Sequence, residues 1–144
     1  MRRLSSAKAT TLLALAASLV VLGLTACSEA DNDTQTEGAS VPEYEVATVE
    51  DLSFGAAVRT QYRVTVPGEP GEAELRAIAE DVIAKAKAEK PFNAVSIGFY
   101  GPGDDLNSAY TLGVAELAPG GDWSAADTVE TGDYDSMELK LEVY

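Results

Sequence analysis

The chain has 144 residues, and its 24 acidic against 10 basic side chains give a formal charge of −14. Such a charge disfavours binding to nucleic acid and to anionic lipid head groups. The sequence contains no histidine and a single cysteine, which excludes a Ser-His-Asp or Cys-His catalytic group and a zinc site made of His and Cys ligands. What remains is carboxylate, Ser–Lys or Tyr chemistry, and oxygen ligation of hard cations such as calcium.

The N-terminus carries the features of a secretory signal. Arg2, Arg3 and Lys8 precede an almost wholly apolar run from Thr11 to Leu24. This run is shorter than the roughly 20 residues that a permanent membrane-spanning helix needs. A positive start, a short apolar segment and small residues before a boundary together predict a signal peptide over residues 1–26.

Leu24-Thr25-Ala26-Cys27 ends this signal, and it resembles the lipobox of bacterial lipoproteins, an aliphatic residue and two small residues before a cysteine. The resemblance implies diacylglyceryl transfer to the Cys27 sulfur, cleavage before Cys27, and acylation of the new amino group, for example by palmitate. Two or more acyl chains hold a protein durably, at roughly 0.8 kcal/mol per buried CH2. We therefore expect a lipid-anchored protein on the extracytoplasmic side of the cell membrane.

Cleavage before Cys27 makes the mature chain more acidic than the precursor. It removes three of the ten basic residues and none of the 24 acidic ones, and leaves 118 residues with a formal charge of −17. Residues 27–41 are polar and acidic and bury too little apolar surface to order themselves, so they are predicted to be a flexible linker. Residues 42–144 have the length of one domain, which must be stabilised without disulfides.

Two strands and one helix are predicted in the first half of this domain. Residues 43–49 alternate well enough for a short strand, and 58–66 alternate strictly, with Arg59, Gln61, Arg63 and Thr65 on one face. Residues 71–90 form the only long helix, and Pro91 ends it. Its buried stripe follows the helical period and comprises Leu75, Ile78, Ala79, Val82, Ile83 and Ala86.

Three further strands are predicted after the helix. Residues 94–100 place Val95, Ile97 and Phe99 inward. In residues 110–117 the alternation directs Tyr110, Leu112 and Val114 inward. In residues 137–143 it directs Met137, Leu139, Leu141 and Val143 inward. Trp123 is predicted to be a lid over one end of the core. The order β-β-α-β-β-β predicts an α+β two-layer sandwich, in which one amphipathic helix packs on a mainly antiparallel sheet of four to five strands.

Several segments between Tyr62 and Tyr134 are similar to a small bacterial domain family of unknown function. They are Arg63-Val64-Thr65-Val66-Pro67, Glu74-Leu75-Arg76-Ala77-Ile78-Ala79, Pro91-Phe92-Asn93-Ala94, Phe99-Tyr100 and Ala118-Pro119-Gly120-Gly121-Asp122-Trp123. The resemblance supports the fold and implies no catalytic residue.

The sheet face turned away from the helix is the predicted binding surface. It would carry Arg59, Arg63 and Lys140, three of the seven basic residues of the mature chain. Small residues on the central strands would leave a shallow groove there. We hypothesise that Arg59 and Arg63 donate hydrogen bonds to a protein partner or to an acidic or sugar-like ligand, and that Tyr100 is a platform for it. The alternative is a solvated face whose cross-strand Arg–Glu pairs contribute little.

The acidic loops give the other candidate sites. Asp104-Asp105 and Asp133-Tyr134-Asp135 offer oxygen ligands for calcium, but solvated turns are the favoured explanation. No catalytic residue, cofactor or metal site is assigned. The sequence therefore predicts a lipid-anchored, non-enzymatic binding or interaction module at the cell envelope, of undefined oligomeric state. The alternatives are a small carboxylate-dependent envelope hydrolase and a calcium-dependent structural module.

Overall fold

The structure is a computed structural model that describes residues 40–144. The predicted signal peptide, the lipobox with Cys27, and the linker up to residue 39 lie outside the described residues. From Ser40 onward the chain forms one α+β unit.

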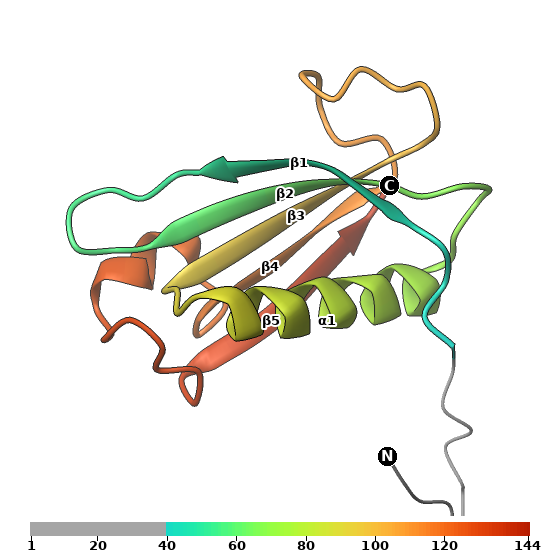
Figure 1. Ribbon diagram of the computed structural model, residues 1–144. Coiled ribbons are helices and arrows are strands. Elements are labelled where there is room, and N and C mark those ends of the chain that lie inside the picture. Colours follow the sequence, from blue (N-terminus) through green and yellow to red (C-terminus); the bar gives the residue numbers. More distant parts are fainter. Residues whose placement is uncertain (1–39) are drawn as a thin grey trace, which may run out of the picture. The chain divides into compact units, whose positions relative to one another are not determined.

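A five-stranded sheet and one long helix make up this unit (Figure 1). The elements are β1 (Glu45–Asp51), β2 (Arg59–Thr65), α1 (Glu72–Glu89), β3 (Ala94–Tyr100), β4 (Gly113–Pro119), the short 3-10 helix η1 (Trp123–Asp127) and β5 (Met137–Val143). The strands lie in sequence order across the sheet, and only β2 and β3, which α1 connects, are parallel. The predicted α+β architecture with a mainly antiparallel sheet is therefore confirmed, since three of the four strand pairings are antiparallel.

Helix α1 covers one face of the sheet with the stripe that its sequence predicts. The six residues expected to be buried are the buried ones: Leu75, Ile78, Ala79, Val82, Ile83 and Ala86. At its start the Gly71 N–H donates to Glu74 Oε2 at 2.8 Å, which satisfies a backbone donor that the helix cannot pair internally. The helix ends just before Pro91, because proline has no backbone N–H with which to continue the helical hydrogen bonding.

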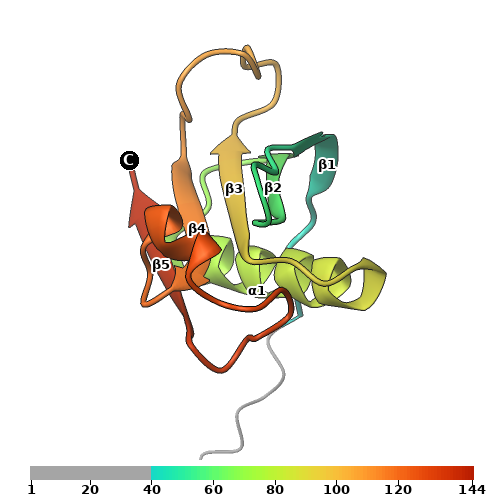
Figure 2. The same cartoon turned by 90° about the vertical axis from the view of Figure 1, so that its left-hand side faces the viewer.

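The main core lies between α1 and the sheet. Strand β2 contributes Tyr62 and Val64 to it, and β3 contributes Val95, Ile97 and Phe99, in the alternation that the sequence predicts. Met137, Leu139 and Leu141 of β5 pack at its margin, as predicted, whereas Val143 at the end of the strand, also predicted to face the core, is exposed. Figure 2 shows α1 on one side of the sheet, and the opposite side is called here the far face. By the alternation of β2 the far face carries Arg59, Gln61 and Arg63.

The face predicted for Val114 is wrong, because a bulge precedes β4, whereas Leu112 just before the strand packs against the core as predicted. The N–H groups of Thr111 and Leu112 both donate to the Phe99 carbonyl, at 3.2 and 3.1 Å, so one residue is inserted opposite Phe99. The insertion reverses the alternation that follows it. Ala115 pairs with Ile97 and faces the core, whereas Val114, expected to face the core, lies on the far face.

The far face is also less open than predicted, since every residue of β3 is buried. The loop between β3 and β4 rises on the side opposite α1 (Figures 1 and 2), and its Tyr110 ring lies on Gly98. At the other end of the sheet Trp123 packs on a second small apolar cluster, which comprises Ala57, Ala94, Ala118 and Ala126. Trp123 therefore covers this cluster rather than an end of the main core.

A buried asparagine joins three segments at that end of the sheet. Asn93 is 1% exposed, and its Oδ1 accepts from the Val58 N–H and from Thr131 Oγ1, each at 2.8 Å. Its Nδ2 donates to the Val129 carbonyl at 3.0 Å. One side chain thus holds the starts of β2 and β3 against the segment that leads to β5.

Candidate functional site

The structure brings Arg59 and Arg63 onto one strand and one face, as predicted. Both belong to β2, four residues apart, which is about 13 Å along a strand. Gln61 lies between them, and its Nε2 donates to the Tyr110 hydroxyl at 2.7 Å. The two guanidinium groups therefore flank the point where the loop meets the far face.

Both arginines have a buried Nε without a hydrogen-bond partner among the described residues. The two side chains differ in their charge partners. Arg63 Nη2 lies 3.2 Å from Glu50 Oε2 of β1, and 23% of the Arg63 side chain is exposed. Within residues 40–144 no carboxylate lies within 4.0 Å of Arg59. Both side chains are partly exposed, so a partner can reach the arginines although it cannot reach the covered Nε atoms.

Tyr100 does not provide the predicted platform. Its side chain is 1% exposed, and its hydroxyl lies 3.2 Å from the Leu106 carbonyl and 3.3 Å from the Ser108 carbonyl, to which it can donate. Burial is the main cause that raises the pKa of the Tyr100 hydroxyl, and the nearby Arg63 charge opposes it. Tyr100 is therefore a support for the loop after β3 and does not offer an open ring face.

Tyr110 occupies the groove that the small residues were expected to leave. A Cβ added to Gly98 would lie 2.5 Å from two carbons of the Tyr110 ring, so the ring fills the space above that glycine. The ring also meets Tyr100 edge-on, with centroids 5.9 Å apart. The sequence analysis missed this role, because strict alternation from residue 110 would direct Tyr110 toward α1.

The acidic loops mainly bond to themselves. Asp104 Oδ2 accepts from the Gly101 N–H at 2.7 Å and from the Thr111 hydroxyl, and Asp105 Oδ1 accepts from the Asn107 N–H at 3.0 Å. Asp122 caps η1 through Ser124, whose hydroxyl and backbone N–H lower the pKa of the Asp122 carboxyl. Among residues 40–144 no three carboxylates converge in a way that could hold a metal ion.

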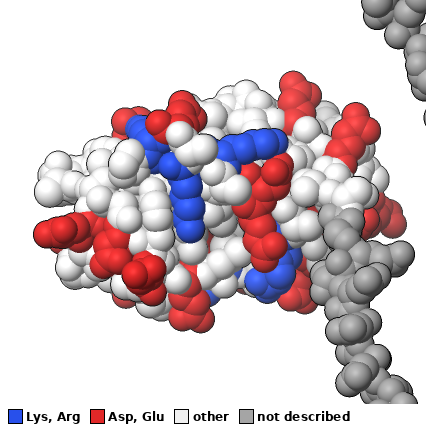
Figure 3. Space-filling model, turned by 60° about the horizontal axis from the view of Figure 1, so that its bottom comes forward, with Lys and Arg blue, Asp and Glu red and all other residues white. Residues whose placement is uncertain are grey.

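On the α1 side of the molecule, basic and acidic side chains lie next to one another (Figure 3). Lys85 Nζ lies 2.8 Å from Asp81 Oδ2, and Arg76 lies 3.6 Å from Glu72, both one helical turn apart. Exposed pairs of this kind contribute little stability and leave few cations free. On the far face Arg63 is paired with Glu50, whereas Arg59 has no such partner in the part of the chain that the structure describes.

Two hollows on the surface lie away from both arginines. One, of about 450 Å³, lies beside β5 and is lined by Arg76, Val114, Glu116, Leu139, Lys140, Leu141 and Glu142. The other, of about 420 Å³, lies between the segment before β1 and α1 and includes Tyr44, Asp81 and Lys85. Neither has Arg59, Arg63 or Tyr100 in its lining, so the candidate site is a surface patch and not a cleft.

Comparisons with protein families, with curated proteins and with solved structures found no match to this chain. The resemblance to a small bacterial domain family therefore stays a prediction. Of the helices in residues 40–144, none is both long and apolar enough to span a membrane.

Proposed function

We propose that the protein is a lipid-anchored, non-enzymatic interaction module at the extracytoplasmic face of the cell membrane. The anchor rests on the charged start of the chain, the short apolar run and the sequence Leu24-Thr25-Ala26-Cys27. The interaction role rests on the far face of the domain. Together they describe a tethered domain that captures a protein or another envelope component.

The observation that carries this proposal is the pair of partly exposed arginines on one face of β2, of which Arg59 has no carboxylate within 4.0 Å among residues 40–144. Both lie on a face that a partner can approach beside the loop after β3, in a chain of strongly negative charge. Carboxylates and other acidic groups accept charge-assisted hydrogen bonds from guanidinium groups in a planar, two-point geometry. The partner chemistry that fits is an acidic protein segment or an acidic or sugar-like envelope component.

Charge reversal on the far face tests this binding role. The full chain is crosslinked in cells, and the captured species are identified by mass spectrometry for the wild type and for Arg59→Glu/Arg63→Glu. The matched control is Lys87→Glu/Lys90→Glu, which changes the net charge equally at the end of α1. Capture that is lost in the arginine variant and kept in the control supports the proposal, and equal capture by all three overturns it.

A neutral variant separates lost binding from lost folding. Arg59→Gln/Arg63→Gln avoids the repulsion that a glutamate at position 63 would meet from Glu50. We expect this variant to melt close to the wild type and still to lose most of its partner. Unchanged capture by a folded neutral variant would also contradict the role of the two arginines.

The anchor is tested independently by Cys27→Ala. Without the thiol no diacylglyceryl group can be attached, so we expect the protein to leave the membrane fraction of a bacterial host. The measurement is fractionation with labelled palmitate. Membrane association and palmitate labelling that persist in Cys27→Ala would reject the anchor while leaving the binding role of the far face untouched.

A further inference from the structure

The two edges of the sheet differ in how they are protected against pairing with another strand. The β1 edge is interrupted by a register shift between Val46 and Thr48, and its charged residues, Glu45, Glu50 and Asp51, are all acidic. Bulges and charged side chains are common means by which an edge strand avoids pairing, and a run of like charges also repels a second copy of the same strand. The β1 edge is therefore blocked, both for addition of a strand and for pairing with a second β1.

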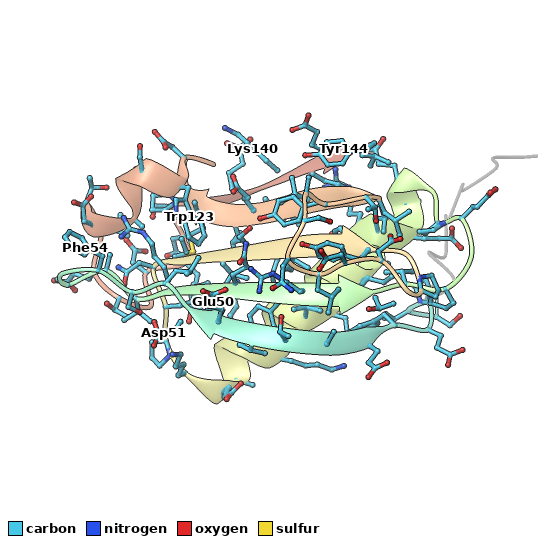
Figure 4. The ribbon with its side chains drawn as sticks, turned by 90° about the horizontal axis from the view of Figure 1, so that it is seen from above. Glu50, Asp51, Phe54, Trp123, Lys140 and Tyr144 are labelled. Atoms are coloured by element: carbon cyan, nitrogen blue, oxygen red, sulfur yellow. The ribbon has the colours of Figure 1, made fainter. Side chains whose placement is uncertain are left out.

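The β5 edge has no register shift and no run of like charges. Its pairing with β4 runs without a shift from Gly113↔Val143 to Pro119↔Met137, and no described strand covers its outer side. Its charges alternate in sign, with Lys140 between Glu138 and Glu142. Lys140 and Tyr144 lie along this edge, opposite Glu50 and Asp51 on the β1 side (Figure 4). The β5 edge is thus a regular strand that is open to pairing.

The backbone shows which residues of β5 direct their hydrogen-bonding groups outward. The Tyr144 N–H donates to the Leu112 carbonyl at 3.2 Å, and the Ser136 carbonyl accepts from the Gly120 N–H at 2.9 Å. Even-numbered residues therefore bond toward β4. Because neighbouring residues of a strand bond in opposite directions, Leu139, Leu141 and Val143 direct their N–H and C=O groups to the free edge.

Charge decides between the possible antiparallel pairings of β5 with a second β5. A two-fold axis at Lys140 would place Lys140 opposite its own copy and Glu138 opposite Glu142, which is unfavourable. An axis at Leu141 places Lys140 opposite Glu142 twice and Leu139 opposite Val143 twice. An axis at Leu139 also pairs unlike charges, and each of the two registers leaves two residues of Met137–Val143 unpaired. The axis at Leu141 is preferred because it pairs the exposed Val143 with Leu139, whereas the axis at Leu139 leaves Val143 outside the pairing.

We propose that the chain forms a symmetric dimer through antiparallel pairing of two β5 edges centred on Leu141. The contact joins two five-stranded sheets into one and is self-complementary, as a two-fold interface must be. It also covers apolar side chains that are open in the single chain, since Val143 is 41% and Tyr144 61% exposed. This inference does not depend on the binding role of Arg59 and Arg63.

Single cysteines on β5 test the register. Leu139→Cys, Leu141→Cys and Val143→Cys are introduced separately into the full chain in bacterial membranes and treated with a short bifunctional thiol reagent. In the proposed register the two copies of residue 141 are neighbours, whereas those of 139 or 143 are about 13 Å apart along the strand. The parent chain, whose only cysteine is Cys27, and Ala56→Cys in the exposed β1–β2 turn report background and random collision.

We expect Leu141→Cys to yield at least tenfold more crosslinked dimer than the other cysteines. Lys140→Glu in the Leu141→Cys background should abolish the product, and Lys140→Glu/Glu142→Lys should restore it, because the opposed pairs are then unlike again. Each variant is checked for an unchanged melting profile. A product at position 139 instead of 141, equal products at all positions, no product, or no rescue by the charge swap would overturn the proposal.

Discussion

The ring of Tyr110 lies directly on Gly98, where a Cβ would come within 2.5 Å of two ring carbons. This contact fixes the loop after β3 on the far face, and the Gln61–Tyr110 hydrogen bond of 2.7 Å secures it from β2. The loop in turn bounds the patch that carries Arg59 and Arg63. A glycine and a tyrosine that are twelve residues apart therefore define one border of the proposed binding face.

Gly98→Ala should displace the Tyr110 ring and destabilise the domain by about 1–3 kcal/mol, because the added methyl group overpacks a filled space. Chemical denaturation measures the cost. The double-mutant cycle with Tyr110→Ala is the control, since removal of the ring should make Gly98→Ala much less costly. The same cost in both backgrounds would show that the ring is not what the methyl group meets.

Asn93→Ala should destabilise the domain by about 2–4 kcal/mol, because it leaves the Val58 N–H and the Val129 carbonyl buried without their partner. Thr131→Val removes one hydrogen bond of the same group and should cost about 1 kcal/mol. Thermal and urea unfolding of both variants provide the comparison. Equal stabilities would mean that Asn93 does not connect the three segments.

A matched pair of substitutions tests the bulge before β4. Ala115→Asp should abolish folding or cost at least about 3 kcal/mol, since it places a charge in the core beside Ile97. Val114→Asp should leave the fold intact, because Val114 lies on the half-exposed far face. Circular dichroism and melting distinguish the two. The reverse outcome would mean that residues 110–117 alternate without a bulge, as the sequence predicted.

The loss of folding stability at acidic pH should depend in part on Asp81. Hydrogen bonds from Lys85 and then from the Tyr44 hydroxyl hold the pKa of Asp81 below its ordinary value of 3.8. A carboxyl whose pKa is lower in the folded state stabilises the protein above the unfolded pKa, and this contribution is lost as the pH falls through the folded value.

Wild type and Asp81→Asn should therefore differ by less than about 1 kcal/mol at pH 7, because the pair is partly exposed. The difference should shrink as the pH falls below 3.8 and through the lowered pKa of Asp81, since Asp81 then becomes neutral like the asparagine. Unfolding curves between pH 7 and pH 2.5 measure it. A gap that is independent of pH would mean that Asp81 acts through packing and not through its charge.

The sequence alone determined the elements whose residues carry a regular period. The stripe from Leu75 to Ala86 on α1 and the alternation of β2, β3 and β5 follow from burial of one side of each element, so each period predicts which residues face the core. The sequence also placed Arg59 and Arg63 together, because residues four apart on a strand share a face.

Only the tertiary structure decided what lies on the far face and which residues of β4 face the core. The bulge opposite Phe99 depends on two N–H groups that share one carbonyl from another strand, a non-local pairing that leaves no trace in the period of residues 110–117. The covering of Gly98 by Tyr110 and the burial of Tyr100 depend on how the loop folds back, which no local pattern encodes. Local periodicity thus fixed the elements, whereas contacts between distant segments fixed the surface of the proposed site.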